Sequence, residues 1–232
     1  MSAFVRYELL NFIRSLKFIP SSVLYLTWVF IMYAYKNVPI LSSYGASSIA
    51  LYLTMTWMAM AMFTMEEEGE KHILFAHLGS KSKYLRGKWL AIFISMIPLM
   101  LFAIFFPILT GSFKGGMTSE YYVLALFCHV IFGIFGVLVG TLFSATRFAT
   151  KKYAWLSAVF VLVCSLASKS LIETAAFLKW ILWLFPPVFY VIEHMGNEFI
   201  VNKEFWIDMI FVILYILLAA QIIVWLFLKK ER

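Results

Sequence analysis

The reactive side chains of this chain gather in one polar block, residues 66–88, which reads EEEGEKHILFAHLGSKSKYLRGK. The block starts with carboxylates, has an apolar middle and ends with basic residues. Glu66 and Glu67 form a carboxylate pair that could activate water for hydrolysis. Long apolar runs flank the block, so it must lie in water between two membrane spans. Its patterning favours a surface offered to a partner, and the alternative is an ordinary solvated loop.

The carboxylate pair is weak evidence for hydrolysis. Glu66-Glu67 followed by Lys71, together with Phe143 four residues before Arg147, is similar to the EExxxR and FxxxR motifs of membrane-embedded prenyl-protein proteases. However, lysine replaces the arginine, and no HxxxN or HxxxD is suitably placed. The glutamates also fall at the water edge rather than in a buried site.

A serine nucleophile is a second possibility. Gly45-Ala46-Ser47 is similar to the GxS triplet of rhomboid proteases, but no histidine in the last apolar run is there to activate the serine. The HExxH and P-loop patterns are missing as well. We therefore expect no enzymatic activity, no catalytic residue, no metal site and no cofactor bound by this chain.

Composition sets the class of protein. The chain has 232 residues, of which 63% are hydrophobic and 13% charged, and its mean hydropathy is +0.91. No soluble domain of this size has that balance. Residues 1–232 are too few for six spans plus a soluble domain, so we predict one transmembrane domain. Cys128 and Cys164 lie in apolar runs, which argues against a disulfide framework. The net charge of +7 reflects membrane topology rather than nucleic acid binding.

We predict an all-α integral membrane fold, because an apolar run of about 20 residues crosses a bilayer as a helix. The six predicted spans are residues 19–36, 46–65, 89–110, 122–146, 153–168 and 206–228. Most of the 19 Lys and Arg residues fall on one side if both termini are inside. The positive-inside rule therefore places both termini and the 66–88 block in the cytosol. We expect a multi-pass protein of the bacterial plasma membrane.

The N-terminal segment, residues 1–17, is predicted to be an amphipathic helix that lies in the membrane interface. Its basic residues point away from an apolar stripe, as in helices that bind lipid headgroups. The stripe consists of Val5, Leu9, Phe12, Ile13 and Leu16. The helix serves as a surface anchor, and it could also hold a partner protein.

The 66–88 block is predicted to form a helix, a break and a second helix that enters the third span. Carboxylates complement the helix dipole at its start, Gly79 favours a stop, and Ser80 or Ser82 can cap the next helix. A loop that needed only solubility would not gather so many apolar side chains. We therefore predict a docking surface made by Glu66, Glu67, Glu68, Glu70, Lys71, His72, Leu74, Phe75 and Leu78.

Three further features lie within or beyond the spans. Residues 170–205 are partly apolar and contain Pro186-Pro187, so we expect short helices that dip into the outer leaflet or re-enter it. Gly136, Gly140 and Ser144 form a small-residue stripe, which serves packing within this chain or contact with a second chain. His129 is the main ionisable residue inside a span, and we expect it to be a hydrogen-bonded packing residue.

This layout resembles the permease subunits of ABC-2 type exporters. That family has six spans with both termini in the cytosol, an elbow helix, a coupling helix between spans two and three, and short re-entrant outer helices. The similarity in layout covers the whole chain. The residue-level match is confined to 68–88, with an acidic start, a Leu-rich turn and a Ser-Lys-x-x-Tyr-Leu-x-Gly-Lys entry that ends at Lys88.

The resemblance implies partners and a function. ATP and Mg²⁺ would be bound by a separate ATP-binding cassette subunit, and two permease chains would pair as a homodimer or heterodimer. The implied function is export of an amphipathic peptide, lipid or drug, and family members that export phenol-soluble modulins are the preferred comparison. The alternative is an ATP-independent immunity or sensor protein that binds a peptide at its outer loops. An intramembrane hydrolase is the third reading.

Overall fold

The computed structural model describes residues 1–148, 152–196 and 203–231. Within these residues the chain is helical, and one isolated bridge joins the loops at Val38 and Phe113. The α-helices are α1 (Ser2–Arg14), α2 (Ile19–Met32), α3 (Ile40–Phe63), α4 (Glu68–Leu78), α5 (Lys81–Thr110), α6 (Ser119–Ala145), α7 (Ala154–Thr174), α8 (Lys179–Leu182), α9 (Val188–Ile192) and α10 (Lys203–Lys230). Two short 3₁₀ helices, η1 (Ala176–Leu178) and η2 (Glu193–Met195), lie beside α8 and α9.

The described helices are those of a multi-pass membrane protein. Five of them, α3, α5, α6, α7 and α10, are long and apolar enough to cross a membrane, and α1 with α2 passes the same test as a pair bent by 78°. The described residues thus contain five candidate spans, or six if the bent pair counts as one.

The predicted span boundaries need correction at several points. The run 19–36 is helical only as far as Met32, and its 14 residues rise only about 21 Å, less than the bilayer core. By contrast, α3 begins at Ile40, α5 at Lys81, and α7 continues to Thr174. Hydropathy marks where lipid begins, whereas these helices extend beyond the apolar run into polar sequence.

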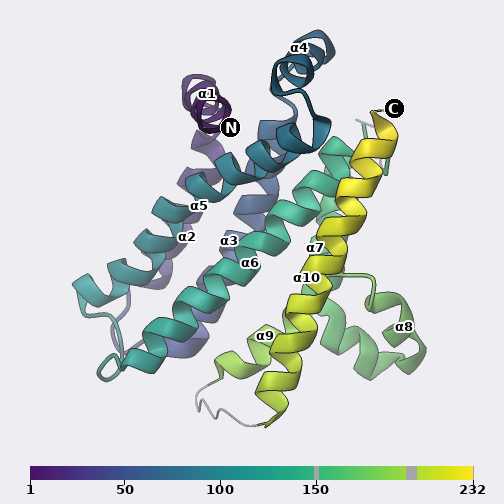
Figure 1. The fold of residues 1–232 in the computed structure, drawn as a ribbon. Coiled ribbons are helices and arrows are strands. Elements are labelled where there is room, and N and C mark those ends of the chain that lie inside the picture. Colours follow the sequence, from purple (N-terminus) through teal and green to yellow (C-terminus); the bar gives the residue numbers. More distant parts are fainter. Residues whose placement is uncertain (149–151, 197–202, 232) are drawn as a thin grey trace.

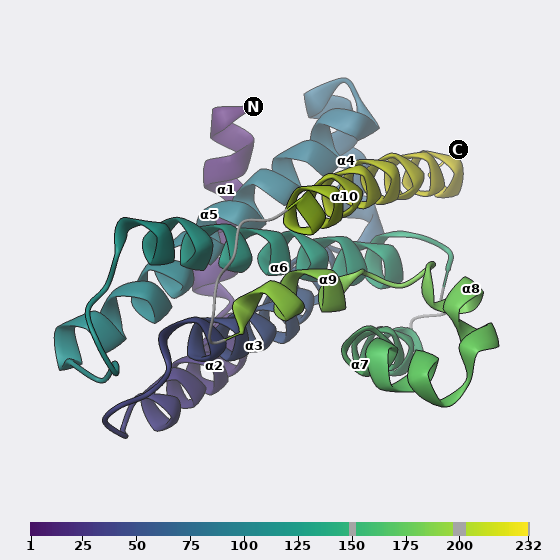
Figure 2. The ribbon, with the colours of Figure 1, turned by 90° about the horizontal axis from the view of Figure 1, so that it is seen from below.

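Helix α6 runs through the middle of the bundle, as Figures 1 and 2 show, with α5, α10, α3 and α7 around it. Its contact with α3 is the most extensive between any two described helices. Both chain termini lie at one end of the bundle together with α1 and α4 (Figure 1). We call this the terminal end, and α8 and α9 lie at the opposite end.

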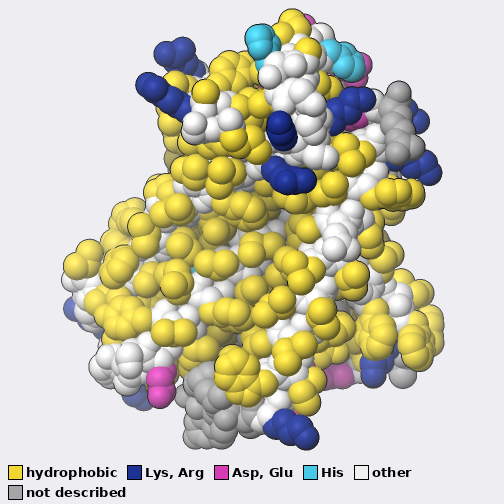
Figure 3. All heavy atoms as spheres, in the orientation of Figure 1, with side chains coloured by type: hydrophobic (Ala, Val, Ile, Leu, Met, Phe, Trp, Pro, Cys, Tyr) yellow, Lys and Arg dark blue, Asp and Glu magenta, His cyan; other side chains and the backbone are white. Residues whose placement is uncertain are grey.

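The surface supports the membrane assignment. A broad belt of hydrophobic side chains covers the middle of the molecule in Figure 3, while Lys and Arg gather at its two ends. Helices α7 and α10 are the least enclosed of the spans. Large apolar side chains point outward from both, which is the pattern of helices that face lipid or another chain. They include Leu156, Phe160, Val163, Ile207, Ile210, Leu214, Leu217 and Trp225.

The predicted outer segment 170–205 begins later than expected, because α7 extends to Thr174. The described part that follows does contain short helices. Val188 and Val191 of α9 are buried and belong to the same core cluster as α7 and α10 residues, so α9 is part of the bundle. Residues 197–202 lie outside the described part of the chain.

Candidate functional site

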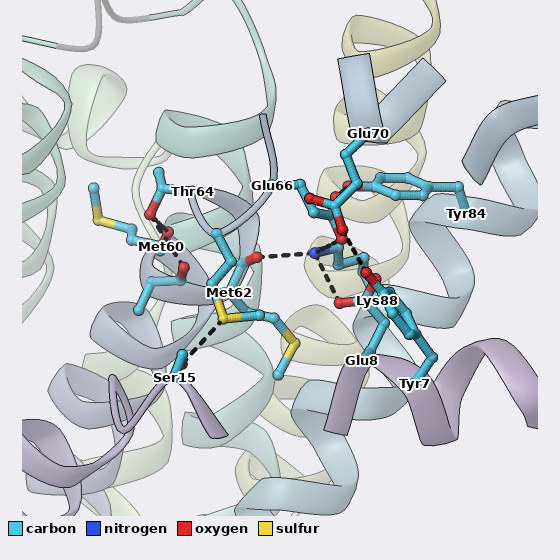
Figure 4. Close-up of polar contacts among 12 residues, drawn as sticks. Tyr7, Glu8, Ser15, Met60, Met62, Thr64, Glu66, Glu70, Tyr84 and Lys88 are labelled. Carbon is cyan, nitrogen blue, oxygen red and sulfur yellow. Dashed lines mark hydrogen bonds and ion pairs between the residues drawn. The ribbon is translucent and has the colours of Figure 1, made fainter. Parts of the chain in front are cut away.

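A buried group of charges joins three segments at the terminal end. Lys88 of α5 is completely enclosed, and its Nζ lies 2.8 Å from Glu8 Oε2 and 2.7 Å from Glu66 Oε1. The same Nζ donates a hydrogen bond to the Met62 carbonyl oxygen, at 2.9 Å. Figure 4 shows the ammonium between the two carboxylates. We call Glu8, Glu66 and Lys88 the charge cluster.

The charge cluster contains two carboxyl groups and one ammonium group. Burial and the hydrogen bond with Glu66 raise the pKa of Glu8 to about 8, although Lys88 opposes the shift. Burial also acts to raise the pKa of Glu66, but Glu8, Lys88 and Tyr84 together outweigh it and hold this pKa below its ordinary value. Glu8 is therefore mainly protonated near neutral pH, and Glu66 is the ionised partner of Lys88.

Two tyrosines extend the charge cluster to α4. The Tyr84 hydroxyl donates a hydrogen bond to Glu66 Oε2, and the Tyr7 hydroxyl donates one to Glu70 Oε1. The hydrogen bond to the Glu70 carboxylate stabilises the neutral Tyr7 hydroxyl, and this raises the pKa of Tyr7. Helix α1 is thus held by polar contacts to both α4 and α5 (Figure 4).

The sequence did not lead us to Glu8 or Lys88, although Glu8 carried a signal. It lies between Val5 and Phe12 on the buried face of α1, where a carboxylate is rarely found unless it is paired. The residues of the predicted stripe fall into a buried group and an exposed group. Val5 and Phe12 are buried and Leu9 packs beside them, whereas Ile13 and Leu16 are exposed. Helix α1 ends at Arg14, so Leu16 lies beyond it with a positive φ of 57°.

Helix α4 turns its apolar face toward its own chain. The Phe75 side chain is only 7% exposed, and its ring centroid lies 4.9 Å from that of Tyr84 and 6.2 Å from that of Phe227. Leu74 and Leu78 pack against the same cluster. The helix ends at Gly79, whose φ of +64° suits glycine. These predicted docking residues therefore connect α4 to α5 and α10.

The remaining predicted docking residues lie around the other sides of α4. Glu67, Glu68 and His72 are exposed, and Ile73 is 61% exposed beside them. Lys71 forms an ion pair with Glu231 at the end of α10 and lies over the Phe227 ring. The exposed side of α4 is thus a mixed surface that includes Ile73.

A cavity of about 570 Å³ opens at the terminal end, beside the charge cluster. Its apolar walls come from α3, α6, α7 and α10, and they include Trp57, Phe143, Trp155 and Phe227. The Trp57 and Trp155 rings meet edge to face, with centroids 5.4 Å apart. Charged residues contribute as well, among them Lys17, Glu68, Lys71 and Lys230. The volume and the mixed lining are typical of a site for a small or amphipathic ligand.

The cavity and the charge cluster share residues. Glu66 and Tyr84 line the cavity and also hold the polar contacts around Lys88. An occupant that displaced the Glu66 carboxylate would therefore change the environment of both Lys88 and Glu8.

The small-residue stripe of α6 packs on α3 within this chain. A Cβ added at Gly136 would lie 2.6 Å from the Tyr52 carbonyl oxygen, and one at Gly140 would lie 2.6 Å from the Thr56 carbonyl oxygen. The backbones of the two helices thus approach each other closely at these glycines. Ser144 lies one turn further along, where it bonds its own helix backbone and lines the cavity.

A serine and a histidine do meet inside the bundle, contrary to our expectation that Ser47 lacks a nearby base. His129 Nε2 lies 3.0 Å from Ser47 Oγ, and its Nδ1 lies 2.7 Å from the Ala125 carbonyl oxygen. Both side chains are fully buried, and neither lines the cavity. Ser47 also donates to the Tyr44 carbonyl oxygen at 3.1 Å. His129 is buried and hydrogen-bonded, as we predicted.

The described residues contain no group of three or more His, Cys, Asp or Glu side chains able to hold a metal ion. The terminal end thus combines an exposed helix, a buried charge cluster and a mixed apolar and charged cavity. Comparisons of this chain with protein families, with curated proteins and with solved structures give no match.

Proposed function

We propose that this chain is the permease subunit of an ATP-driven exporter of the ABC-2 type, and that it moves an amphipathic substrate outward. The observation that carries the proposal is the placement of α4. This helix stands outside the bundle, between two spanning helices in the sequence, and its contacts reach α1, α5 and α10. The Lys and Arg distribution supports a cytosolic position for this end.

Coupling would run through the two faces of α4. An ATP-binding subunit docks on the exposed face around Ile73 and pushes on the helix. The inner face passes the displacement to α5 and α10 through the rings of Tyr84 and Phe227. The Tyr7–Glu70 contact passes it to α1. ATP shifts the permease between two states only to the extent that these contacts differ between them.

The cavity at the terminal end is the proposed receiving site for the substrate. Aromatic side chains such as Trp57, Trp155 and Phe143 give it walls that accept many apolar shapes, and Met60 adds a deformable surface. Lysine and glutamate residues at the same site suit the polar face of an amphipathic molecule. In this proposal the substrate enters from the cytosol or inner leaflet, and a second permease chain completes the path.

The docking surface is tested by co-purification from mild detergent, with ATPase activity measured in the eluate. Ile73→Asp is the informative variant because Ile73 is exposed, whereas Phe75→Asp would damage the packing of α4. We expect Ile73→Asp to lower the ATPase recovered by about tenfold or more, as for a central interface residue. The matched control is Thr174→Asp, which adds the same charge at an exposed position on the opposite end.

Two outcomes would contradict this proposal. In the first, the wild-type chain purifies without any ATP-binding protein. In the second, Ile73→Asp recovers as much ATPase as Thr174→Asp does.

One observation favours the alternative of a peptide-binding protein. Trp180 and Leu184, on and after α8, are 75% and 76% exposed, and Phe177 beside them is 70% exposed. Such a group of exposed apolar side chains is typical of an interaction surface or of contact with lipid. Absence of an ATPase partner together with peptide binding that is lost in Trp180→Ala would favour this alternative.

A further inference from the structure

Glu8 is an unusual residue for a helix at the edge of the bundle. It is the only acidic residue of α1, and its side chain is 0% exposed. The ionisable groups around it are Lys88 and Tyr84 of α5 and Glu66 of the turn before α4. Tyr7, next to it in sequence, bonds Glu70 of α4.

The charges of this cluster do not balance if both carboxyl groups are ionised. One ammonium then faces two carboxylates in a site closed to water, and one negative charge stays uncompensated, which is strongly unfavourable. The hydrogen bonds do not balance either. The three N–H groups of Lys88 face Glu8 Oε2, Glu66 Oε1 and the Met62 carbonyl oxygen, which leaves Glu8 Oε1 buried without a partner.

A single proton corrects both deficits. When Glu8 is protonated, the cluster is neutral, and the Glu8 hydroxyl can donate to the Glu66 carboxylate. Glu66 then remains paired with Lys88 and Tyr84. We propose that Glu8 and Glu66 form a proton-binding site, and that the proton held there fastens α1 to the bundle. The inference goes beyond ATP-driven export, because it requires neither an ATPase nor a transported substrate.

The direction of the pH dependence follows from the contacts. The pKa of Glu8 is about 8 when α1 is docked, because of burial and the Glu66 hydrogen bond, and it returns to about 4.5 when the carboxyl meets water. Docking therefore takes up a proton. Its strength is greatest below the lower of these values, falls as the pH rises between them, and levels off above the higher one.

Amide hydrogen exchange in α1 tests the proposal on the detergent-solubilised chain. After correction for the intrinsic pH dependence of exchange, the opening equilibrium of the amides from Val5 to Phe12 should increase by about tenfold for each pH unit between about pH 6 and about pH 8. Above about pH 8 the curve should become flat. In parallel, the infrared band of a protonated carboxylic acid should be present at about pH 6 and lost by about pH 9.

Three variants separate the proton from a merely structural role. Glu8→Gln removes the titrating group, so it should abolish both the pH slope and the infrared band. Glu66→Gln leaves Glu8 alone beside Lys88, which favours ionised Glu8, so it should abolish both as well. Glu70→Gln is the matched control, because it removes the charge from the Tyr7 contact between α1 and α4 but should keep the slope.

The proposal is overturned if α1 protection in the wild-type chain is independent of pH in this range. It is equally overturned if the slope or the infrared band persists in Glu8→Gln. If Glu8→Gln does not fold, the wild-type curve and Glu66→Gln still decide the question. If both variants lose protection uniformly but keep the pH slope of the wild type, the carboxyl groups only pack.

Discussion

The close approach of α3 and α6 predicts a graded response to adding one methyl group at each of four glycines. At Gly136 and Gly140 the new Cβ would meet backbone atoms of α3, at 2.6 Å in each case. At Gly133 it would meet the Sδ atom of Met96, the mobile part of a flexible side chain. At Gly69, in α4, nothing lies within 4 Å. The four sites therefore differ in what must move.

The expected free energies follow from these contacts. Carbon atoms pack at about 3.5–4.0 Å, so Gly140→Ala must separate two helix backbones by about 1 Å. Forced overpacking of this kind costs about 1–3 kcal/mol. All four sites are helical, so each gains about 1 kcal/mol from the better helix propensity of alanine. Gly69→Ala should thus be neutral or stabilising, Gly133→Ala intermediate, and Gly136→Ala and Gly140→Ala destabilised.

Thermal unfolding in a mild detergent measures the series. A difference of about 2 kcal/mol should separate the melting temperatures of Gly140→Ala and Gly69→Ala by about 4–8 °C for a chain of this size. If Gly136→Ala and Gly140→Ala melt together with Gly69→Ala, the close contact between α3 and α6 is wrong. If they instead keep their stability and lose a dimer, the stripe joins two chains rather than two helices of one chain.

Three other predictions concern buried side chains. Lys88→Met should destabilise the chain by about 3–5 kcal/mol, because the buried Glu66 carboxylate loses its cation. Adding Glu8→Gln and Glu66→Gln should restore most of the melting temperature. Ser47→Ala should lower the free energy of unfolding by about 1–3 kcal/mol, because it removes a buried hydrogen-bond partner of His129. In the intact chain Ser47 should not react with a fluorophosphonate, and labelling at this residue would contradict its packing role. Phe75→Asp should lower the free energy of unfolding by about 3 kcal/mol or more, because packing is lost and a charge is buried. A melting temperature equal to that of the wild type would show that α4 does not pack inward.

Local sequence signals were sufficient for the helices and some of their ends. The apolar run predicted at 122–146 corresponds to α6, Ser119–Ala145, because an uninterrupted run in lipid has no alternative to a helix. Gly79 ends α4 with a positive φ, as the pattern of the 66–88 block predicted. These features depend on a few consecutive residues, and no distant contact decides them.

Features that depend on contacts between distant residues could not be predicted from these local signals. An apolar face on α4 predicts burial, but it does not say whether a partner or the chain itself provides the cover, and the structure shows Tyr84 and Phe227 beside Phe75. The pairing of Ser47 with His129 was missed for a similar reason. The GxS pattern predicts a histidine in the final span, whereas the packing of α3 on α6 brings His129 of α6 to Ser47.

The charge cluster is the clearest example of a feature that only contacts between distant residues create. Glu8, Glu66 and Lys88 are separated by many residues, and only the docking of α1 against α5 and the α3–α4 turn brings them together. Glu66 also lines the cavity, so an occupant that paired with its carboxylate would bind with an affinity that depends on whether the proposed proton is present. This dependence is reciprocal by thermodynamic necessity. A cationic occupant beside Glu66 would compete with the ammonium of Lys88, weaken proton binding at Glu8 and so loosen α1, whereas a rise in pH that releases the proton would favour the same occupant.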